Sequence, residues 1–568
     1  MGIVPRSVLP RRLRQRLPVR VRQNGKLLTG GVAFLVVLTV LLGTERIRPF
    51  VIGAGDTGRD PVSVDVAGTV DLFDAGRAHT FALTFRDADY ERMLDEYWKE
   101  GEKGYVEADL TVDGTTIPSV GIRLKGNSTL RQLTWKGETR PLTDDGDGGP
   151  PAGGFPATGQ QQAGGTAQQD GRRGGRALGG PASTTLKAEE PETLPWLVSF
   201  DEFVEGRRYQ GHREVTVRVG GMGGGATVLN EALSLALLDA TGEVAQRYAY
   251  SSFRVNDRPT TARLLVEHPD EHFADRIDGT GVLYKSLATS SFTDQGDDPT
   301  AYADDFTQVT MKGSQDLQPV MNLIRWVNSA DDEEFDAHLA DRVDVASFAR
   351  YVAVQNLLLN FDDMAGPGRN YYLWYDLGTK KFRVISWDHN LTFSGSADQG
   401  PHDSAGFGPG LGPRLGPATG QDGTATGQDG TAPGGSTNGD QAAQPPAGMQ
   451  PPAGMQPPAG MQPPGGTDAS GDATRGGARG GMMTGHRLKE HFLASAAFKG
   501  VYEDAYRELY QQIYASGTAT RTLDAIGAVV KAVDGADAAT VDSDVARLRT
   551  LIAQRTESLA DDEVITRS

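Results

Sequence analysis

The 568-residue sequence contains no cysteine, and this absence removes several classes of protein at once. Without thiols there is no disulfide scaffold, no cysteine nucleophile and no zinc or iron–sulfur site with cysteine ligands. Positive charge is also scarce, because 56 Lys and Arg residues stand against 74 Asp and Glu residues and leave a net charge of −18. We therefore expect no nucleic-acid partner, since neutralising phosphates requires clustered basic residues.

The N-terminus departs from this acidic average. Residues 1–26 contain eight basic residues and no acidic one, and residues 27–44 form an uncharged run rich in Leu and Val that is just long enough to cross a bilayer. We predict a basic cytoplasmic tail over 1–26, a single transmembrane helix over 27–44, a linker over 45–61 and a main domain outside the cell membrane. A cleaved signal peptide is the alternative, although no Ala-x-Ala-like site follows the apolar run.

Two segments are too rich in Gly, Pro, Gln and Ala to bury a core. They cover residues 146–183 and 396–483, and the second contains the repeat PPAGMQ three times in succession. Such segments bury too little apolar surface to offset the entropy of ordering them, so we predict that both are disordered. The globular domain is then expected over residues 62–395, with residues 484–568 completing it.

The remaining sequence predicts an α+β protein. Residues 62–120 and 248–266 alternate apolar and polar side chains as strands do, and residues 370–387 read as a β-hairpin. Helical spacing of apolar residues occurs over 227–241, 317–329, 333–339, 345–360 and most of 486–562. Strands first and helices later suggest two lobes, one β-rich and one helical.

Most of the residues suited to catalysis or metal binding lie between Asn360 and Asn390. Asp362 and Asp363 follow a long apolar helix, a Gly-Pro-Gly loop leads to Asn370, and the hairpin ends at Asp388. Phosphoryl transfer needs a carboxylate near the attacking hydroxyl and hard oxygen ligands that hold magnesium on the phosphates. An acid, an amide and a second acid in this order suit that chemistry. Taken alone, the pattern also fits turn and cap residues, which Asp residues near glycines often are.

Eight short motifs in the same order resemble the CotH kinase family, the spore coat protein H-like proteins. They are GIRLKGNS at 121–128, FDEFVEGRRYQG at 200–211, VN at 255–256, LLVE at 264–267, VLYK at 282–285, NFD at 360–362, NYYLW at 370–374 and WDHN at 387–390. The resemblance implies a diverged, two-lobed protein-kinase-like fold. It also implies transfer of the ATP γ-phosphate to Ser or Thr of secreted or surface proteins, with Mg²⁺ or Mn²⁺.

The resemblance also assigns residues by position. Asp362 resembles the catalytic-loop Asp, with Asp363 as the alternative, whereas Asn370 and Asp388 resemble the metal ligands. A kinase also needs a basic residue on the ATP phosphates that is held by an acid.

Four residues are candidates for binding the nucleotide. Lys285 and Glu267 lie in family-like motifs, and Arg123 and Lys125 of the motif at 121–128 are the other candidates. Family members usually carry a Lys in the strand after that motif, but here residues 194–200 contain Trp196 and no Lys. The alternative function is therefore a catalytically inactive, pseudokinase-like structural protein of the cell envelope or spore surface.

Overall fold

The computed structural model describes residues 60–126, 129–140, 186–220, 225–403 and 485–567. The predicted cytoplasmic tail and transmembrane helix, nearly all of the linker, the insertion at 146–183 and most of the segment at 396–483 lie outside these ranges. Of the helices within them, none combines the length and the apolar character that a membrane crossing requires.

The first part of the fold is a closed β-barrel. Its strands follow one another around the barrel in the order β10-β11-β9-β7-β4-β3-β2, and only the β10–β2 pair is parallel. The strands are β2 (Ala78–Thr84), β3 (Val106–Val112), β4 (Thr115–Leu124), β7 (Trp196–Ser199), β9 (Glu214–Val217), β10 (Tyr248–Val255) and β11 (Thr261–Glu267). Two small pairs flank it, namely β1 (Val64–Val66) with β8 (Arg207–Tyr209) and β5 (Thr134–Trp135) with β6 (Glu138–Thr139).

Helix α4 (Asp87–Glu100) lies between β2 and β3, where the sequence predicted only strands. Its buried residues Tyr90, Met93, Leu94 and Tyr97 have helical spacing and pack into the hydrophobic core of the barrel. This helical spacing was visible in the sequence, but the alternating pattern of the flanking strands led to a prediction of strands throughout.

The second part is a sheet covered by helices. The antiparallel sheet has the order β13-β12-β14-β15, and the short helix α6 (Glu271–Ala274) precedes it. The strands are β12 (Gly281–Ser286), β13 (Phe306–Gln308), β14 (Tyr371–Asp376) and β15 (Phe382–Ser386). The helices are α7 (Gln318–Ser329), α8 (Asp332–Arg342), α9 (Val345–Leu357), α10 (Arg487–Ala494), α11 (Ala496–Tyr510), α12 (Thr518–Lys531), α13 (Ala538–Ala560) and α14 (Glu563–Thr566).

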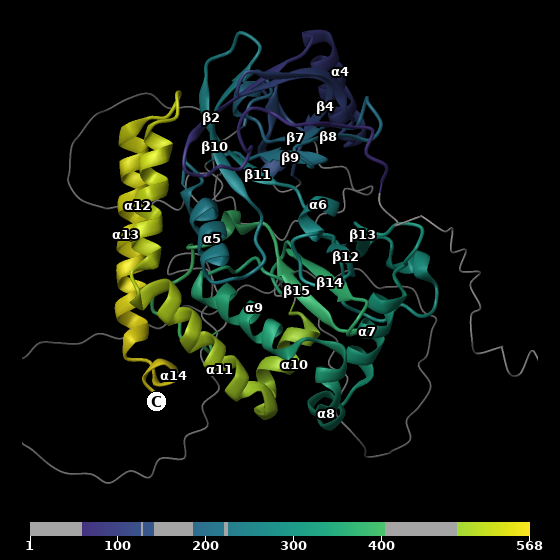
Figure 1. Ribbon diagram of the computed structural model, residues 1–568, viewed down its shortest axis with the longest axis vertical. Coiled ribbons are helices and arrows are strands. Elements are labelled where there is room, and N and C mark those ends of the chain that lie inside the picture. Colours follow the sequence, from purple (N-terminus) through teal and green to yellow (C-terminus); the bar gives the residue numbers. More distant parts are fainter. Residues whose placement is uncertain (1–59, 127–128, 141–185, 221–224, 404–484, 568) are drawn as a thin grey trace, which may run out of the picture.

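Helix α5 (Leu229–Ala240) lies in the chain between the barrel strands β9 and β10, but its buried residues pack into the core of the second part. One hydrophobic core contains residues of α5, of the β12–β14 sheet and of the C-terminal helices α10–α14. Figure 1 shows α12 and α13 side by side along one edge of the molecule, with α12 packed against α5. The α+β class with a β-rich part followed by helices is confirmed, and the equivalence of these parts to two kinase lobes stays a prediction.

The buried Arg555 of α13 shows that the ordered core extends past residue 395. Its guanidinium donates to the carbonyl oxygens of Ala397, Gln399 and Asn356, and Gln399 is itself buried. The boundary predicted at residue 396 is therefore too early, because residues 396–403 supply backbone acceptors to a buried charge.

Candidate functional site

The loop after α9 holds Asp362 in a fixed orientation. Gly368 N–H donates to Oδ1 of Asp362 over 2.5 Å, and Nδ2 of Asn370 donates to Oδ2 over 2.9 Å. Oδ1 of Asn360 accepts the backbone N–H of Asp362 over 3.2 Å. Burial raises the pKa of Asp362 to about 6, and the negative charges of Asp388 and Asp363 add to this rise although the hydrogen bond from Gly368 opposes it. Asp362 is thus a preorganised carboxylate whose pKa lies close to neutrality.

Asp363, the alternative catalytic residue, is committed to another role. It forms an ion pair with Lys489 of α10, and its Oδ1 accepts the backbone N–H of Ala365 over 2.8 Å. Only 3% of the Asp363 side chain is exposed. These contacts tie the loop to the C-terminal helices, whereas Asp362, among the described residues, is bonded only to residues of its own loop and to Asn370.

The β14–β15 hairpin brings Asn370 and Asp388 to one end of the sheet. Tyr371 pairs with Ser386 in the ladder, so Asn370 comes directly before this last pair and Asp388 follows it by two residues. Asp388 has φ +58°, in the left-handed region, and 26% of its side chain is exposed. Burial alone would raise the pKa of Asp388, but the charges of Arg218 and Lys125 lower it. An ionised carboxylate and an amide side chain therefore lie at the same end of the hairpin.

Two residues that the sequence analysis did not identify complete this site. Arg218, directly after β9, donates from Nη2 to Oδ1 of Asp388 over 2.7 Å and to Oε1 of Glu231 over 2.5 Å. Glu231 lies in the first turn of α5 and is 1% exposed. Burial favours the neutral form of Glu231 and raises its pKa, whereas the charge of Arg218 opposes this rise. A cation at the end of a strand, held by an acid in the first turn of a helix and beside an Asp, is similar to the arrangement that protein kinases use.

Three cationic side chains surround the indole ring of Trp387. The Nζ atoms of Lys125 and Lys285 lie 5.2 and 5.3 Å from its centroid, and the guanidinium carbon of Arg218 lies at 5.9 Å. Burial and the charges of Lys285 and Arg218 lower the pKa of Lys125 to about 7. Burial likewise lowers the pKa of Lys285. So many cations around one ring create a site that a polyanion would stabilise.

Arg123 lies at the margin of this cation cluster. Its guanidinium carbon is 5.2 Å from the ring centroid of Tyr105, whose hydroxyl donates to Glu214 over 3.1 Å. Glu214 also pairs with Nδ1 of His268 at 2.8 Å, and His268 packs edge-on against Trp387. Arg123 in β4, Lys125 directly after β4, Arg218 directly after β9 and Lys285 in β12 thus come from three strands of the two sheets and lie close enough to interact through their charges.

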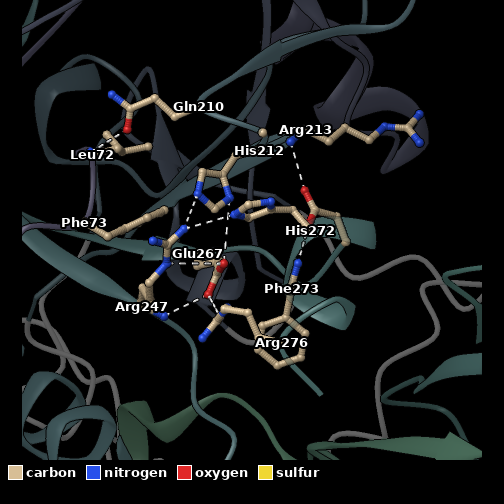
Figure 2. A network of polar contacts seen from close by, with 12 residues as sticks. Leu72, Phe73, Gln210, His212, Arg213, Arg247, Glu267, His272, Phe273 and Arg276 are labelled. Carbon is tan, nitrogen blue, oxygen red and sulfur yellow. Dashed lines mark hydrogen bonds and ion pairs between the residues drawn. The ribbon is translucent and has the colours of Figure 1, made fainter. Parts of the chain in front are cut away.

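Glu267 belongs to a different cluster, shown in Figure 2. This fully buried carboxylate pairs with Arg276, accepts the backbone N–H of Arg247 over 2.9 Å and lies 3.7 Å from Nδ1 of His212. Within the described residues, the partners of Glu267 are Arg276, Arg247 and His212 and do not include Lys285. Glu267 therefore joins β11 to the segment after α6, and within the described residues it is Glu231 that holds a cation of the candidate site.

Replacing Glu267 with alanine is expected to destabilise the fold without weakening nucleotide binding. The change leaves Arg247 and Arg276, which are 32% and 34% exposed, without their buried acceptor, a loss that typically costs about 1–3 kcal/mol. Urea unfolding would measure it. The exposed β3 residue Glu107 provides the control, since Glu107→Ala should shift the unfolding free energy by less than about 0.5 kcal/mol. Equal stability of the two variants would contradict a structural role for Glu267.

The residues present fit a metal–nucleotide complex. Carboxylate and amide oxygens are the ligands that Mg²⁺ prefers, and it usually takes its remaining ligands from water and phosphates. The carboxylate of Asp388 and the side-chain oxygen of Asn370 are oxygen atoms of this type, and the cations around Trp387 carry charge opposite to that of phosphates. In the described ranges there is no group of three or more His, Asp or Glu residues that could bind a metal by themselves.

Comparison with known families agrees with this geometry. Residues 189–433 match the family described as CotH kinase protein. This match supports assigning residues 189–433 to the CotH kinase family. The CotH match includes Arg218, Glu231, Lys285, Asp362, Asn370 and Asp388, whereas Arg123, Lys125 and the C-terminal helices lie outside it. Among curated proteins there is no match to the chain.

Proposed function

We propose that this CotH-family chain is a protein kinase that acts outside the cytoplasm, anchored in the cell membrane by residues 27–44. It would transfer the γ-phosphate of ATP to Ser or Thr hydroxyls of secreted or surface proteins. The observation that carries the proposal is the Arg218–Glu231–Asp388 contact, at 2.5 and 2.7 Å, beside the oriented carboxylate of Asp362. The family supports it further, because a kinase family implies in general ATP and a divalent metal.

Each residue has a role that follows from its position. Lys125, Lys285 and Arg218 would neutralise the phosphates, with Glu231 fixing the guanidinium. Asp388 and Asn370 would hold Mg²⁺, which when bound neutralises the charge that develops on the transferred phosphoryl group. The acceptor hydroxyl oxygen forms a bond to the γ-phosphorus while the bond to the bridging oxygen breaks and ADP leaves. Asp362 accepts the hydroxyl proton.

The inactive, pseudokinase-like alternative was based on the absence of a Lys from residues 194–200. Arg218 supports the kinase instead, because it could supply the missing positive charge. All four residues of β7 are buried and none is charged, so this strand indeed supplies no cation. The neighbouring strand β9 leads directly into Arg218 instead. A guanidinium remains charged and presents several donors to phosphate oxygens, so it can take the place of an ammonium there.

Nucleotide-dependent thermal stabilisation of the full chain in detergent tests this proposal. Mg-ATP at about 100 times its Kd should stabilise the folded state by about 2.7 kcal/mol, which raises the melting temperature by roughly 5 °C. Asp388→Ala removes the metal carboxylate and should abolish the shift. Glu107→Ala should retain it, because Glu107 is exposed on β3. No shift of the unsubstituted chain with any nucleotide and Mg²⁺ or Mn²⁺ would favour the inactive scaffold.

A further inference from the structure

The first turn of α5 adopts a conformation that needs support from elsewhere. Val228, its N-cap residue, has φ +56° and ψ +27°, in the left-handed region, and is buried. For a β-branched residue this conformation is a genuine outlier, and it persists only where surrounding contacts fix it. The turn that follows contains Glu231, which holds Arg218.

A contact from the far end of the chain supplies that support. The buried carboxylate of Asp544, on α13, accepts the backbone N–H of Thr227 over 3.1 Å and its hydroxyl over 2.6 Å. On the other side of the same residue, the hydroxyl of Tyr250 donates to the Thr227 carbonyl over 2.9 Å. A Cβ on Gly225 would lie 2.5 Å from Oδ1 of Asp544, so glycine permits this close approach.

The same turn also contacts the loop that follows Asp388. Nδ2 of Asn230 donates to the carbonyl of Asn390 over 2.7 Å, and Ser234 donates to the hydroxyl of Thr392 over 2.7 Å. Adjacent residues of α5 therefore position Arg218 on one side and the Asp388 loop on the other. A displacement of this turn would therefore move Arg218 and the Asp388 loop away from each other or out of their present positions.

We propose that Asp544 is a positioning residue, which fixes the start of α5 and thereby keeps Arg218 and Asp388 in the geometry that binds nucleotide phosphates. The effect of Asp544 on nucleotide binding rests on the proposed function, whereas the contact between Asp544 and Thr227 does not. Asp544 lies outside the region that matches the CotH kinase family. The pair α12–α13, which lies beside α5 in Figure 1, is then part of the phosphate-binding machinery.

Hydrogen exchange of the full chain without nucleotide tests the positioning role directly. In Asp544→Ala we expect the amides of residues 229–234 to exchange about tenfold faster than in the unsubstituted protein, because two hydrogen bonds to a charged acceptor are lost. Asp544→Asn keeps an acceptor oxygen and should restore most of the protection. Asp542→Ala is the matched control, since this exposed residue of the same helix pairs with Lys531. Unchanged exchange of 229–234 in Asp544→Ala would overturn the proposal.

Nucleotide binding tests the consequence and separates it from the proposed function. Measured well below the melting temperature, the Kd for Mg-ATP should rise about tenfold in Asp544→Ala, recover in Asp544→Asn and stay unchanged in Asp542→Ala. A lower melting temperature with an unchanged Kd would overturn the positioning role and assign Asp544 to stability alone. If the unsubstituted chain binds no nucleotide, the proposed function fails, while the exchange experiment still decides whether Asp544 fixes α5.

Discussion

Replacing Arg218 with methionine is expected to weaken Mg-ATP binding by at least about a hundredfold and to destabilise the protein as well. Its guanidinium contacts Asp388 at 2.7 Å and Glu231 at 2.5 Å, so the change removes a phosphate-facing cation and leaves two carboxylates without their partner. Breaking a buried ion pair on one side typically costs about 3–5 kcal/mol. Calorimetric titration with Mg-ATP and urea unfolding would measure the two effects separately.

Two further variants separate binding from stability. Arg218→Met combined with Glu231→Leu removes the buried Arg218–Glu231 pair and leaves only the partly exposed Asp388 without its guanidinium partner, and replacing a buried ion pair by apolar residues is often neutral. The double variant should therefore recover much of the lost stability but none of the nucleotide affinity. Arg218→Lys keeps a charge but not the forked donor geometry, and should bind with intermediate affinity. Full affinity of the double variant would show that Arg218 does not contact phosphate.

The acid–amide–acid set could be predicted because its members lie close together in the sequence. Asp362, Asn370 and Asp388 occur within one loop and one hairpin, and antiparallel pairing of a hairpin fixes which ends meet. The ladder register then places Asn370 and Asp388 at the same end of the sheet. Local sequence and local structure coincide here, and the predicted set needed no knowledge of the rest of the fold.

Arg218 and Glu231 were missed although their signal was present. A strand ending in a cation, a glycine-rich run and a helix with an acid in its first turn occur in that order. The order is that of the kinase Lys–Glu pair, but the family-like pattern predicts a lysine, and it predicts it in an earlier strand. Glu267 was misplaced for the converse reason. It lies in a family-like motif, yet as the last residue of β11 it turns toward Arg276 and Arg247.

The support of α5 by Asp544 could not be predicted from sequence. Thr227 and Asp544 are separated by 317 positions, and neither lies in a recognisable motif. Only the packing of α12 and α13 against α5 brings them together. Helix periodicity predicts that such helices exist and which face is apolar, but it contains no information on which distant helix each one contacts.

Replacing Asp362 with asparagine is expected to lower kcat by about a thousandfold, within the range that general acid–base catalysis contributes. Transfer of labelled γ-phosphate to peptides with Ser and Thr acceptors would measure it at saturating Mg-ATP. The neighbouring Asp363→Asn is the matched control. It breaks the ion pair with Lys489, so it should lower the melting temperature. It should lower kcat much less than Asp362→Asn does. A larger loss of kcat in Asp363→Asn than in Asp362→Asn would contradict the assignment.

The pH dependence tests the same assignment independently. The pKa of Asp362 is raised to about 6, mainly by burial, and only the ionised carboxylate can accept a proton. Activity of the unsubstituted protein should therefore rise as the pH increases through about 6, and the residual activity of Asp362→Asn should lack this acidic limb. If Lys125, whose pKa is lowered to about 7, binds phosphate in its protonated form as proposed, kcat/KM should fall again above that pH. Lys125→Arg should move this fall to higher pH, because a guanidinium stays charged there.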